Sequence, residues 1–350
     1  MIDHFGTTIA GDAVHAITLG GHGLRARLLT RGAIVQDLRL DGIAHRLTLG
    51  SDRLADYEGE MRYSGALVGP VANRIGQASL PLGGRTLKLT PDRGSPHLLH
   101  SGAHGLHQAI WTVGNRSRTA VTLTCTRRPD DDGFPGTRQI EAQFSLHPPA
   151  TLRLSLRATT DTASPINIAN HSYWNLDGTE TWAGHRLRIA ADAYLPVTDD
   201  ILPTGEIRPV TGTAMDLRPA SQRSDPTPGA PALDHNFCLS TGPTALRDVL
   251  WLTGQSGVSM TMATTEPGLQ VFDGRPGYAG LALEAQGWPD APNQRQFPAI
   301  TTTAQNSYRQ VTEWRLTARQ PTPAHHLLAK NIPGEAQRAG GGAPKRTNIS

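Results

Sequence analysis

The chain has 350 residues, with 33 Lys and Arg against 30 Asp and Glu, so its formal net charge is +3 at pH 7. This excess is small and no basic stripe is interleaved with aromatic residues, which argues against nucleic-acid binding. No apolar run approaches the length of a membrane span, and the N-terminus lacks the pattern of a signal peptide. We therefore expect a cytoplasmic protein that binds no membrane.

Short apolar runs separated by turn residues dominate the chain, which contains 37 glycines and 26 prolines. Within residues 15–40, the runs LRARLL and IVQDLRL alternate apolar with polar residues, as a strand with one buried face does. The alternation continues along the chain. We expect further strands over residues 85–90, 120–126, 138–146, 150–160, 185–197, 257–265 and 281–286.

One short helix is expected in SDRLADYEGE, with Ser51 as its N-cap. No segment carries a helical apolar stripe over three turns. The sequence therefore predicts an all-β protein with two large antiparallel sheets packed face to face. We expect a single domain over residues 1–318, followed by a basic, Pro- and Gly-rich tail over residues 319–350 that is mobile.

Two cysteines, Cys125 and Cys238, lie in strand-like apolar settings without a CxxC spacing. We expect buried free thiols rather than a disulfide or a metal site. The segment RRPDDDGFPG contains three adjacent aspartates, residues 130–132, before a glycine. It lacks the alternating oxygen ligands and final glutamate of a calcium loop, so we expect a solvated turn.

Four histidines in SPHLLHSGAHGLHQAIW are spaced three, four and three residues apart. On a helix they would share one face, as metal ligands do. Pro96, Gly102 and Gly105 interrupt any such helix, so we expect no metal site. His100 enters a loop after two leucines, which favours a hydrogen-bonding role. The four histidines are His97, His100, His104 and His107.

Glu284 lies in LALEAQ, where alternation places three apolar residues on one face and Glu284 beside Gln286 on the other. A desolvated glutamate has a raised pKa and is suited to act as a general base near neutral pH. The alternative is an ordinary solvent-exposed glutamate. Position alone leaves Asp234 as a turn residue or a ligand of substrate hydroxyls, and Arg74 as a surface ion pair or a positioned donor.

His171 lies in INIANHSYWNLDG, where it leaves the apolar row and is followed by Tyr173 and Trp174. It is either a structural histidine or part of a sugar site, which uses an acid/base group, hydrogen-bonding side chains and an aromatic face. A tuned histidine paired with a glutamate supplies both halves of acid/base catalysis.

Eight segments between residues 14 and 316 resemble, in order, the motifs of the aldose 1-epimerase (galactose mutarotase) family. Each alone is a weak signal, whereas eight in one order are hard to produce by chance. The segments are GPVANRIGQASLPLGGRTLKLT, LLHSGAHGLHQAIW, DDDGFPG, NHSYWNLDG, YLPVTDDILPTGEIRPVTGTAMDLR, LDHNFCL, GLQVFDG and LALEAQGWPDAPNQRQFP.

The resemblance implies a β-supersandwich fold and interconversion of the α and β anomers of an aldose such as galactose or glucose. Such a reaction exchanges no electrons and releases no group, so we expect neither cofactor nor metal, and we expect a monomer or homodimer. Carried over by motif, Glu284 would be the general base and His171 the general acid. The residues that would hold the sugar hydroxyls are Asn73, Arg74, His100, Ser172, Tyr173, Asp234 and Gln270.

The chain departs from the family pattern at several positions. Pro70 stands where the family often has Arg, Trp174 replaces a common Phe, and Ser101 replaces a Gly. AQNSYRQ also replaces a usual Pro-Gly-Glu turn. These differences leave the preferred sugar open, because pocket shape sets that choice.

Three alternative functions remain open from the sequence. One is a sugar-binding module without catalysis. Another is an epimerase of a phosphorylated hexose, which would need further Arg or Lys beside Arg74 to bind the phosphate. A glycosidase with two carboxylates is the third, although Glu284 and Asp234 show no acid partnership.

Overall fold

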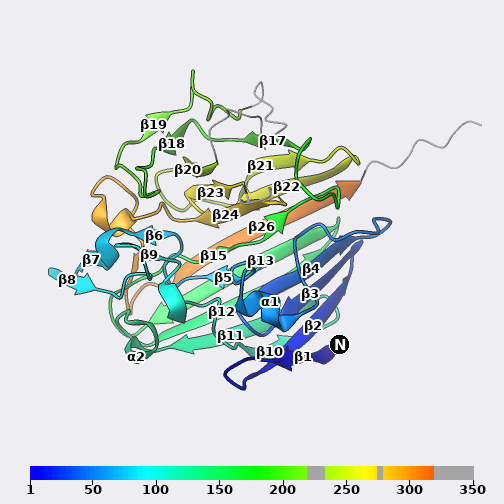
Figure 1. The fold of residues 1–350 in the computed structure, drawn as a ribbon, viewed down its shortest axis with the longest axis horizontal. Helices are drawn as coiled ribbons and strands as arrows, with labels where there is room; N and C mark the ends of the chain where they lie inside the picture. The colour runs from blue at the N-terminus through cyan, green and yellow to red at the C-terminus, as the bar shows by residue number, and fades with distance from the viewer. Residues whose placement is uncertain (219–232, 274–278, 319–350) are drawn as a thin grey trace, which may run out of the picture. The chain divides into compact units, whose positions relative to one another are not determined.

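The computed structural model describes residues 1–218, 233–273 and 279–318. Residues Met1–Ala318 form one compact unit, in which antiparallel strands dominate (Figure 1). The α-helices among the described residues are short: α1 spans Leu54–Glu58 and α2 spans Pro129–Asp132. The tail expected to be mobile, residues 319–350, lies outside the described residues.

The largest sheet has eight antiparallel strands in the order β10-β11-β12-β13-β26-β22-β21-β17. The expected alternation is clear in β12, where Ile140, Ala142 and Phe144 are buried and the residues between them are exposed. This buried row belongs to the main hydrophobic core. The strands are β10 (Thr112–Arg116), β11 (Ala120–Arg127), β12 (Arg138–His147), β13 (Thr151–Thr160), β26 (Tyr308–Ala318), β22 (Val258–Thr264), β21 (Arg247–Thr253) and β17 (Arg186–Ile189).

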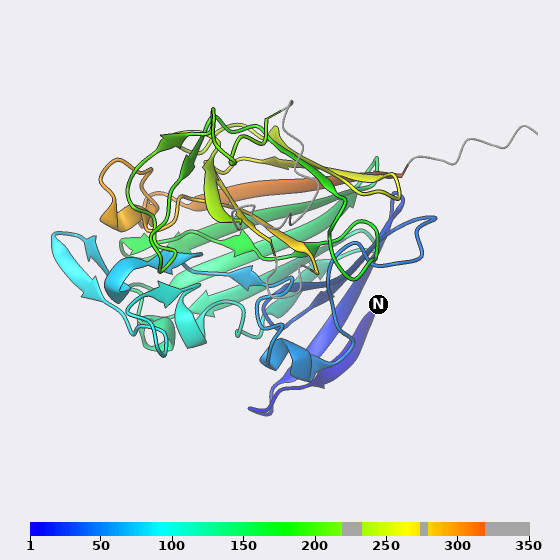
Figure 2. The same ribbon diagram turned by 45° about the horizontal axis from the view of Figure 1, so that its top comes forward.

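A second sheet has six strands in the order β16-β24-β23-β20-β18-β19 and lies over the first sheet (Figure 2). The Trp174 and Trp314 rings, one from each sheet, have centroids 5.8 Å apart. The Gln310 amide of the large sheet donates to the Ala285 carbonyl at 2.8 Å. The strands are β16 (Tyr173–Trp174), β24 (Leu281–Gln286), β23 (Gly268–Phe272), β20 (Asp234–Cys238), β18 (Ala193–Leu195) and β19 (Arg208–Pro209).

The prediction of two large sheets packed face to face is therefore confirmed. Every expected strand segment contains at least one strand. All six residues of β24 are buried, so the sheet that carries Glu284 is covered on both faces. The alternative of a solvent-exposed Glu284 is wrong, because Glu284 is 1% exposed on a strand whose two faces are both covered.

A third sheet, of four antiparallel strands, forms the N-terminal part of the chain, drawn in blue in Figure 1. Four two-stranded pairs complete the described part, and two of them, β5–β15 and β6–β9, lead directly into candidate site residues. These strands are β1 (Ile2–Thr7), β2 (Ala13–Gly21), β3 (Leu24–Leu29), β4 (Ile34–Leu40), β5 (Leu67–Val68), β15 (Ala169–Asn170), β6 (Arg74–Ile75), β9 (Leu98–Leu99), β7 (Ser79–Leu82), β8 (Arg85–Lys88), β14 (Ser164–Pro165) and β25 (Thr301–Thr302).

Two local expectations have different outcomes. Helix α1 begins one residue after Arg53, which is its N-cap, so the assignment of Ser51 as N-cap is wrong. The Ser51 hydroxyl instead accepts a hydrogen bond from the Arg53 amide at 3.0 Å and donates to the Asp56 carboxylate in the first helical turn, without capping a helical backbone amide. Cys125 and Cys238 are free thiols, as expected; the first is buried and the second half-buried.

The acidic turn is only partly solvated. The Asp132 side chain is fully buried, and its Oδ1 forms an ion pair with the equally buried Arg138 guanidinium at 2.8 Å. At the start of α2, the Asp131 carboxylate accepts a hydrogen bond from the Arg128 backbone amide at 2.6 Å. Asp130 is exposed. The expected solvated turn is wrong for Asp132, because a cation from β12 reaches beneath the turn.

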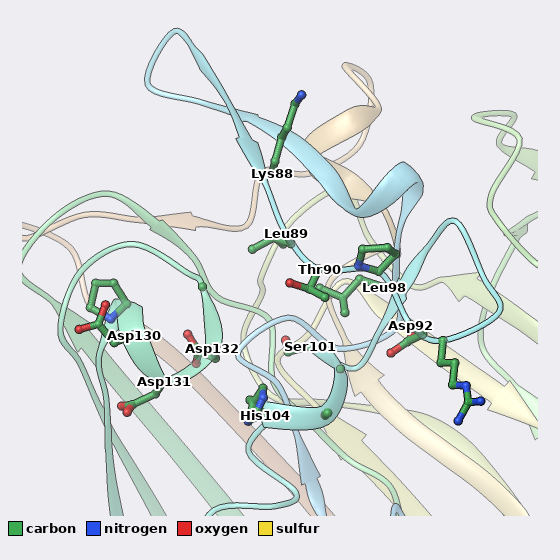
Figure 3. Close-up of a pocket in the computed structure, with 16 residues that line it drawn as sticks. Lys88, Leu89, Thr90, Asp92, Leu98, Ser101, His104, Asp130, Asp131 and Asp132 are labelled. Atoms are coloured by element: carbon green, nitrogen blue, oxygen red, sulfur yellow. The ribbon is translucent and has the colours of Figure 1, made fainter.

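The acidic turn also borders a pocket of about 410 Å³, shown in Figure 3. Asp130 and Asp131 line one side, and Lys88 and Asp92 come from segments on the other. None of the helices in the described part of the chain has the length and apolar character that a membrane crossing requires.

Candidate active site

Backbone hydrogen bonds fix the position of His171. The residue follows β15 and precedes β16. Its amide donates to the Ala66 carbonyl at 2.8 Å, and its carbonyl accepts from the Gly65 amide at 3.0 Å. The β5–β15 pair therefore fixes the main chain of His171 on both sides. The residue is 4% exposed.

Glu284 approaches His171 from β24. Its Oε1 lies 3.5 Å from His171 Nε2, and Glu284 is 1% exposed. In the register of the sheet, Glu284 lies opposite Gln270 of β23. A carboxylate and an imidazole from distant parts of the sequence thus meet in a nearly dry environment, in reach of one substrate.

Burial shifts the two groups in opposite directions. It raises the pKa of Glu284 well above its ordinary value; the nearby charge of Asp234 adds to this rise and that of Arg74 opposes it. Burial lowers the pKa of His171 to about 4. Both shifts favour the neutral form of the group, so at neutral pH the pair holds a single proton.

Asp234, Gln270 and Arg74 form a polar group beside this pair. The Gln270 amide donates to Asp234 Oδ1 at 2.6 Å. An Arg74 guanidinium nitrogen lies 4.0 Å from Asp234 Oδ2, and both side chains are about one-fifth exposed. The group therefore combines a cation, an anion and an amide that a small polar molecule can still reach.

Asn73 and His100 hold one another. The Asn73 backbone amide donates to His100 Nδ1 at 3.1 Å, and the His100 backbone amide donates to the Asn73 backbone carbonyl at 3.0 Å. Both residues have positive φ, 61° and 52°. Because Nδ1 of His100 accepts a hydrogen bond, Nε2 of the neutral ring carries the hydrogen and can donate. Burial lowers the pKa of His100 well below its ordinary value, which keeps the ring neutral.

Among the described residues, His100, His171 and Glu284 form a group whose potential metal-ligand atoms all lie within 4.8 Å of one another. Two imidazoles and a carboxylate also occur as the protein ligands of catalytic zinc. Acid/base catalysis on one small substrate requires the same close approach, so the spacing fits either chemistry.

The four spaced histidines do not converge. His97 Nε2 lies 3.2 Å from Asp200 Oδ2, and His104 is exposed beside the pocket of Figure 3. His100 and His107 are both buried. The short turn over Gly102–His104 separates them, as the glycines in the sequence indicated.

Tyr173 and Ser172 differ in their relation to His171. The Tyr173 ring centroid lies 5.0 Å from that of His171. The Ser172 amide donates to Asn170 Oδ1 at 3.2 Å, and its hydroxyl is buried without a hydrogen-bond partner in the described part of the chain. The Ser172 side chain makes none of the side-chain hydrogen bonds, ion pairs or ring contacts described above for the other candidates. Alternate side chains of an extended backbone point to opposite sides, which explains the difference from its neighbours.

One residue at the site carried no sequence signal. The Tyr63 ring has its centroid 5.8 Å from that of His171, with the two planes 23° apart. It also lies 4.9 Å from the His100 ring and 4.8 Å from the His107 ring. Tyr63 precedes the short strand β5 in a segment without alternation, so periodicity could not identify it.

Comparison with known proteins gives a consistent family. The family model described as aldose 1-epimerase matches residues 15–315. Galactose mutarotase from Rattus norvegicus is 32% identical over 328 residues, covering 88% of this chain and 95% of that protein. Aldose 1-epimerase from Escherichia coli is 28% identical over 336 residues, covering 88% of this chain and 96% of that protein.

Solved structures agree with this result. An aldose epimerase homologue from C. elegans has a TM-score of 0.82 at 29% identity, covering 87% of this chain and 99% of that chain. Galactose 1-epimerase from Lactobacillus acidophilus has a TM-score of 0.77 at 24% identity. The match covers 91% of this chain and 98% of that chain and shows that the two share the fold. The β-supersandwich expected from the resemblance is confirmed.

Proposed function

The chain belongs to the aldose 1-epimerase family, and from this membership we propose how its own residues interconvert the α and β anomers of an aldose. The observation that supports the proposal most directly is the 3.5 Å approach of His171 Nε2 to Glu284 Oε1 in a buried site. The activity is an isomerisation of a carbohydrate. The comparisons favour it over the sugar-binding module and the phosphorylated-hexose epimerase.

In the proposed reaction, Glu284 takes the proton from the anomeric hydroxyl while His171 donates a proton to the ring oxygen. The bond between the anomeric carbon and the ring oxygen breaks, and the sugar opens to a free aldehyde. Rotation about the adjacent carbon–carbon bond presents the other carbonyl face. Closure reverses both proton transfers and gives the opposite anomer. No group leaves and no electrons are exchanged, so atoms and charges balance.

The proton content of the pair suits this cycle. The cycle needs Glu284 without a proton and His171 with one. Burial favours the opposite placement of this single proton, on Glu284, because it raises the proton affinity of Glu284 and lowers that of His171. The bound sugar would therefore have to stabilise the charged pair, and the charge of Arg74 already opposes the rise at Glu284.

The remaining candidates would orient the sugar by hydrogen bonds. Arg74 supplies donors, Asp234 supplies acceptors, and the neutral His100 ring donates from Nε2. The Gln270 side-chain amide also donates to Asp234 Oδ1, which helps to fix the orientation of the carboxylate. We assign sugar-hydroxyl binding to Asn73, Arg74, His100, Ser172, Tyr173, Asp234 and Gln270.

Galactose is the substrate that we propose first, because the similar protein from Rattus norvegicus is named a galactose mutarotase. Fresh α-galactose changes its optical rotation as it equilibrates, and the protein should accelerate this change. A polarimetric series over galactose, glucose, xylose and arabinose would rank the sugars. Equal rates with and without protein for all four would reject the proposed activity. The cytoplasmic location and the monomeric or dimeric state stay predictions.

A further inference from the structure

Tyr63 occupies an unusual position among the histidines of the site. Its ring contacts three imidazoles, those of His100, His107 and His171, at centroid distances of 4.9, 4.8 and 5.8 Å. The contact with His171 is a stacked one, while that with His107 is edge-on. An aromatic ring packed against three others restricts the rotation of each about its side-chain bonds.

The same ring borders an open cleft. A cleft of about 580 Å³ is lined by Tyr63, His107 and Arg62, among other residues, whereas His100 and His171 are not part of its wall. Arg74, a candidate sugar-binding residue, also lines it, so the cleft adjoins the site. The Arg62 guanidinium lies over the Tyr63 ring, 4.9 Å from its centroid. Tyr63 is half-buried, and His171 is only 4% exposed. The ring therefore separates the water of the cleft from the imidazole of His171.

We propose that Tyr63 is a positioning residue of this enzyme, whose ring holds the His171 and His100 imidazoles in place and keeps the water of the neighbouring cleft away from them. The inference rests on the acid/base role given to His171 above. Tyr63 touches no reacting atom in the proposed reaction. It acts by orienting the two imidazoles and by excluding water from them. Orientation and desolvation together set how readily His171 exchanges a proton.

A pH profile can detect this role. If water reaches the pair, the desolvation that shifts both groups is reduced, so the pKa of His171 rises towards its ordinary value and that of Glu284 falls. The pH range over which the pair holds one proton then narrows from both sides. The groups facing His171 are Glu284, Tyr63, Tyr173, His100 and His107, and those acting on Glu284 include Asp234 and Arg74.

Tyr63→Leu and Tyr63→Phe in the full chain test the proposal. We expect Tyr63→Leu to lower kcat by about 10²-fold, the scale of a displaced catalytic group, with a much smaller change in KM. Its acid limb should move to higher pH and its alkaline limb to lower pH. Tyr63→Phe retains the ring and should restore both the rate and the width of the profile.

Phe5→Leu is the matched control, since Phe5 is also half-buried and lies under a guanidinium, that of Arg27, at 5.2 Å. It should leave the pH profile unchanged. Wild-type kcat and profile in a folded Tyr63→Leu protein would overturn the inference. If this variant does not fold, Tyr63→Met replaces it, and failure of both to fold would assign Tyr63 a structural role instead. Wild-type activity in Glu284→Gln would reject the catalytic proposal itself, so the two failures are distinguishable.

Discussion

Gln270 lies directly opposite Glu284 across the β23–β24 ladder, and its amide donates to Asp234 Oδ1 at 2.6 Å. Three adjacent strands, β20, β23 and β24, therefore each contribute one polar side chain to the same part of the sheet. The Gln270 carbonyl oxygen is buried without a hydrogen-bond partner among the described residues. A buried acceptor of this kind is stabilised when a ligand hydroxyl donates to it.

Replacing the proposed base should nearly abolish turnover. Glu284→Gln retains the size of the side chain but cannot take a proton, and a positioned base contributes about 10²–10⁴-fold in rate. Polarimetry on fresh α-galactose measures the loss, and circular dichroism checks the fold. A variant with the wild-type rate would exclude Glu284 as the base.

A second pair of variants should distinguish loss of the general acid from loss of sugar binding. His171→Asn should lower kcat on a similar scale, because it removes the proton donor. Arg74→Ala removes a donor that is one-fifth exposed at the site, and we expect mainly a higher KM. Sugar binding, measured by calorimetry, should survive better in His171→Asn than in Arg74→Ala. The reverse order would contradict the assigned roles.

The pH dependence of kcat/KM should be a broad plateau. The active pair holds one proton, so activity falls where the pair gains a second proton or loses its only one. Burial lowers the pKa of His171 to about 4 and raises that of Glu284 well above its ordinary value. The acid limb should therefore lie near pH 4, and the alkaline limb well above the ordinary range of a carboxyl group. An acid limb near the usual histidine pKa would show that His171 is solvated.

A second buried glutamate should affect stability and not catalysis. Glu266 is 3% exposed, its Oε1 has no hydrogen-bond partner among the described residues, and burial raises its pKa to about 8. The folded protein holds this proton more tightly than the unfolded chain does, so the contribution of Glu266 to stability declines as pH rises from about 4.5 to about 8.

Glu266→Gln removes this dependence, because the amide does not ionise. The free energy of unfolding of the variant, relative to wild type, should therefore be higher at pH 9 than at pH 5, by about 1.4 kcal/mol for each pH unit crossed between the two pKa values of Glu266. Urea unfolding at the two pH values measures it. Glu141→Gln, on the exposed side of β12, is the control. A difference from wild type that does not change with pH would contradict the assigned burial.

The acidic turn offers a test of buried charge. Asp132→Asn leaves the buried Arg138 without its carboxylate, and breaking such a pair costs about 3–5 kcal/mol. Asp130→Asn changes an exposed neighbour in the same turn and should alter the free energy of unfolding by less than about 0.5 kcal/mol. Urea unfolding of the two variants measures the contrast. Equal effects would mean that Asp132 is solvated as the sequence suggested.

Much of the architecture could be predicted because strands leave a local signal. The alternating rows of β12 and β13 are readable in the sequence, and both strands occur in the structure. Sheet stacking over β24 is not local, so periodicity alone could not decide whether Glu284 was exposed. The N-cap error at Ser51 concerns the end of an element, which a sequence pattern defines only to within one or two residues: the N-cap is Arg53, and it makes no side-chain capping hydrogen bond.

The candidate site was predictable only in part. His171 and Glu284 were identified as residue types in suggestive settings, but their approach depends on strand order, which no local pattern reveals. Tyr63 was missed because its importance lies in contacts with three distant rings. The Arg138 partner of Asp132 was missed for a similar reason, since the two belong to different elements.

Both hydrogen bonds between Asn73 and His100 use the backbone of Asn73, and one of them ends on the His100 ring. The His100 side chain therefore supports the left-handed backbone conformation of Asn73, whereas a change of the Asn73 side chain leaves both hydrogen bonds available. A substitution of His100 should then alter sugar affinity through Asn73 as well as through the lost ring, so its effect should not add to that of a substitution at Asn73. An engineered change of sugar preference should therefore keep residue 100 as histidine.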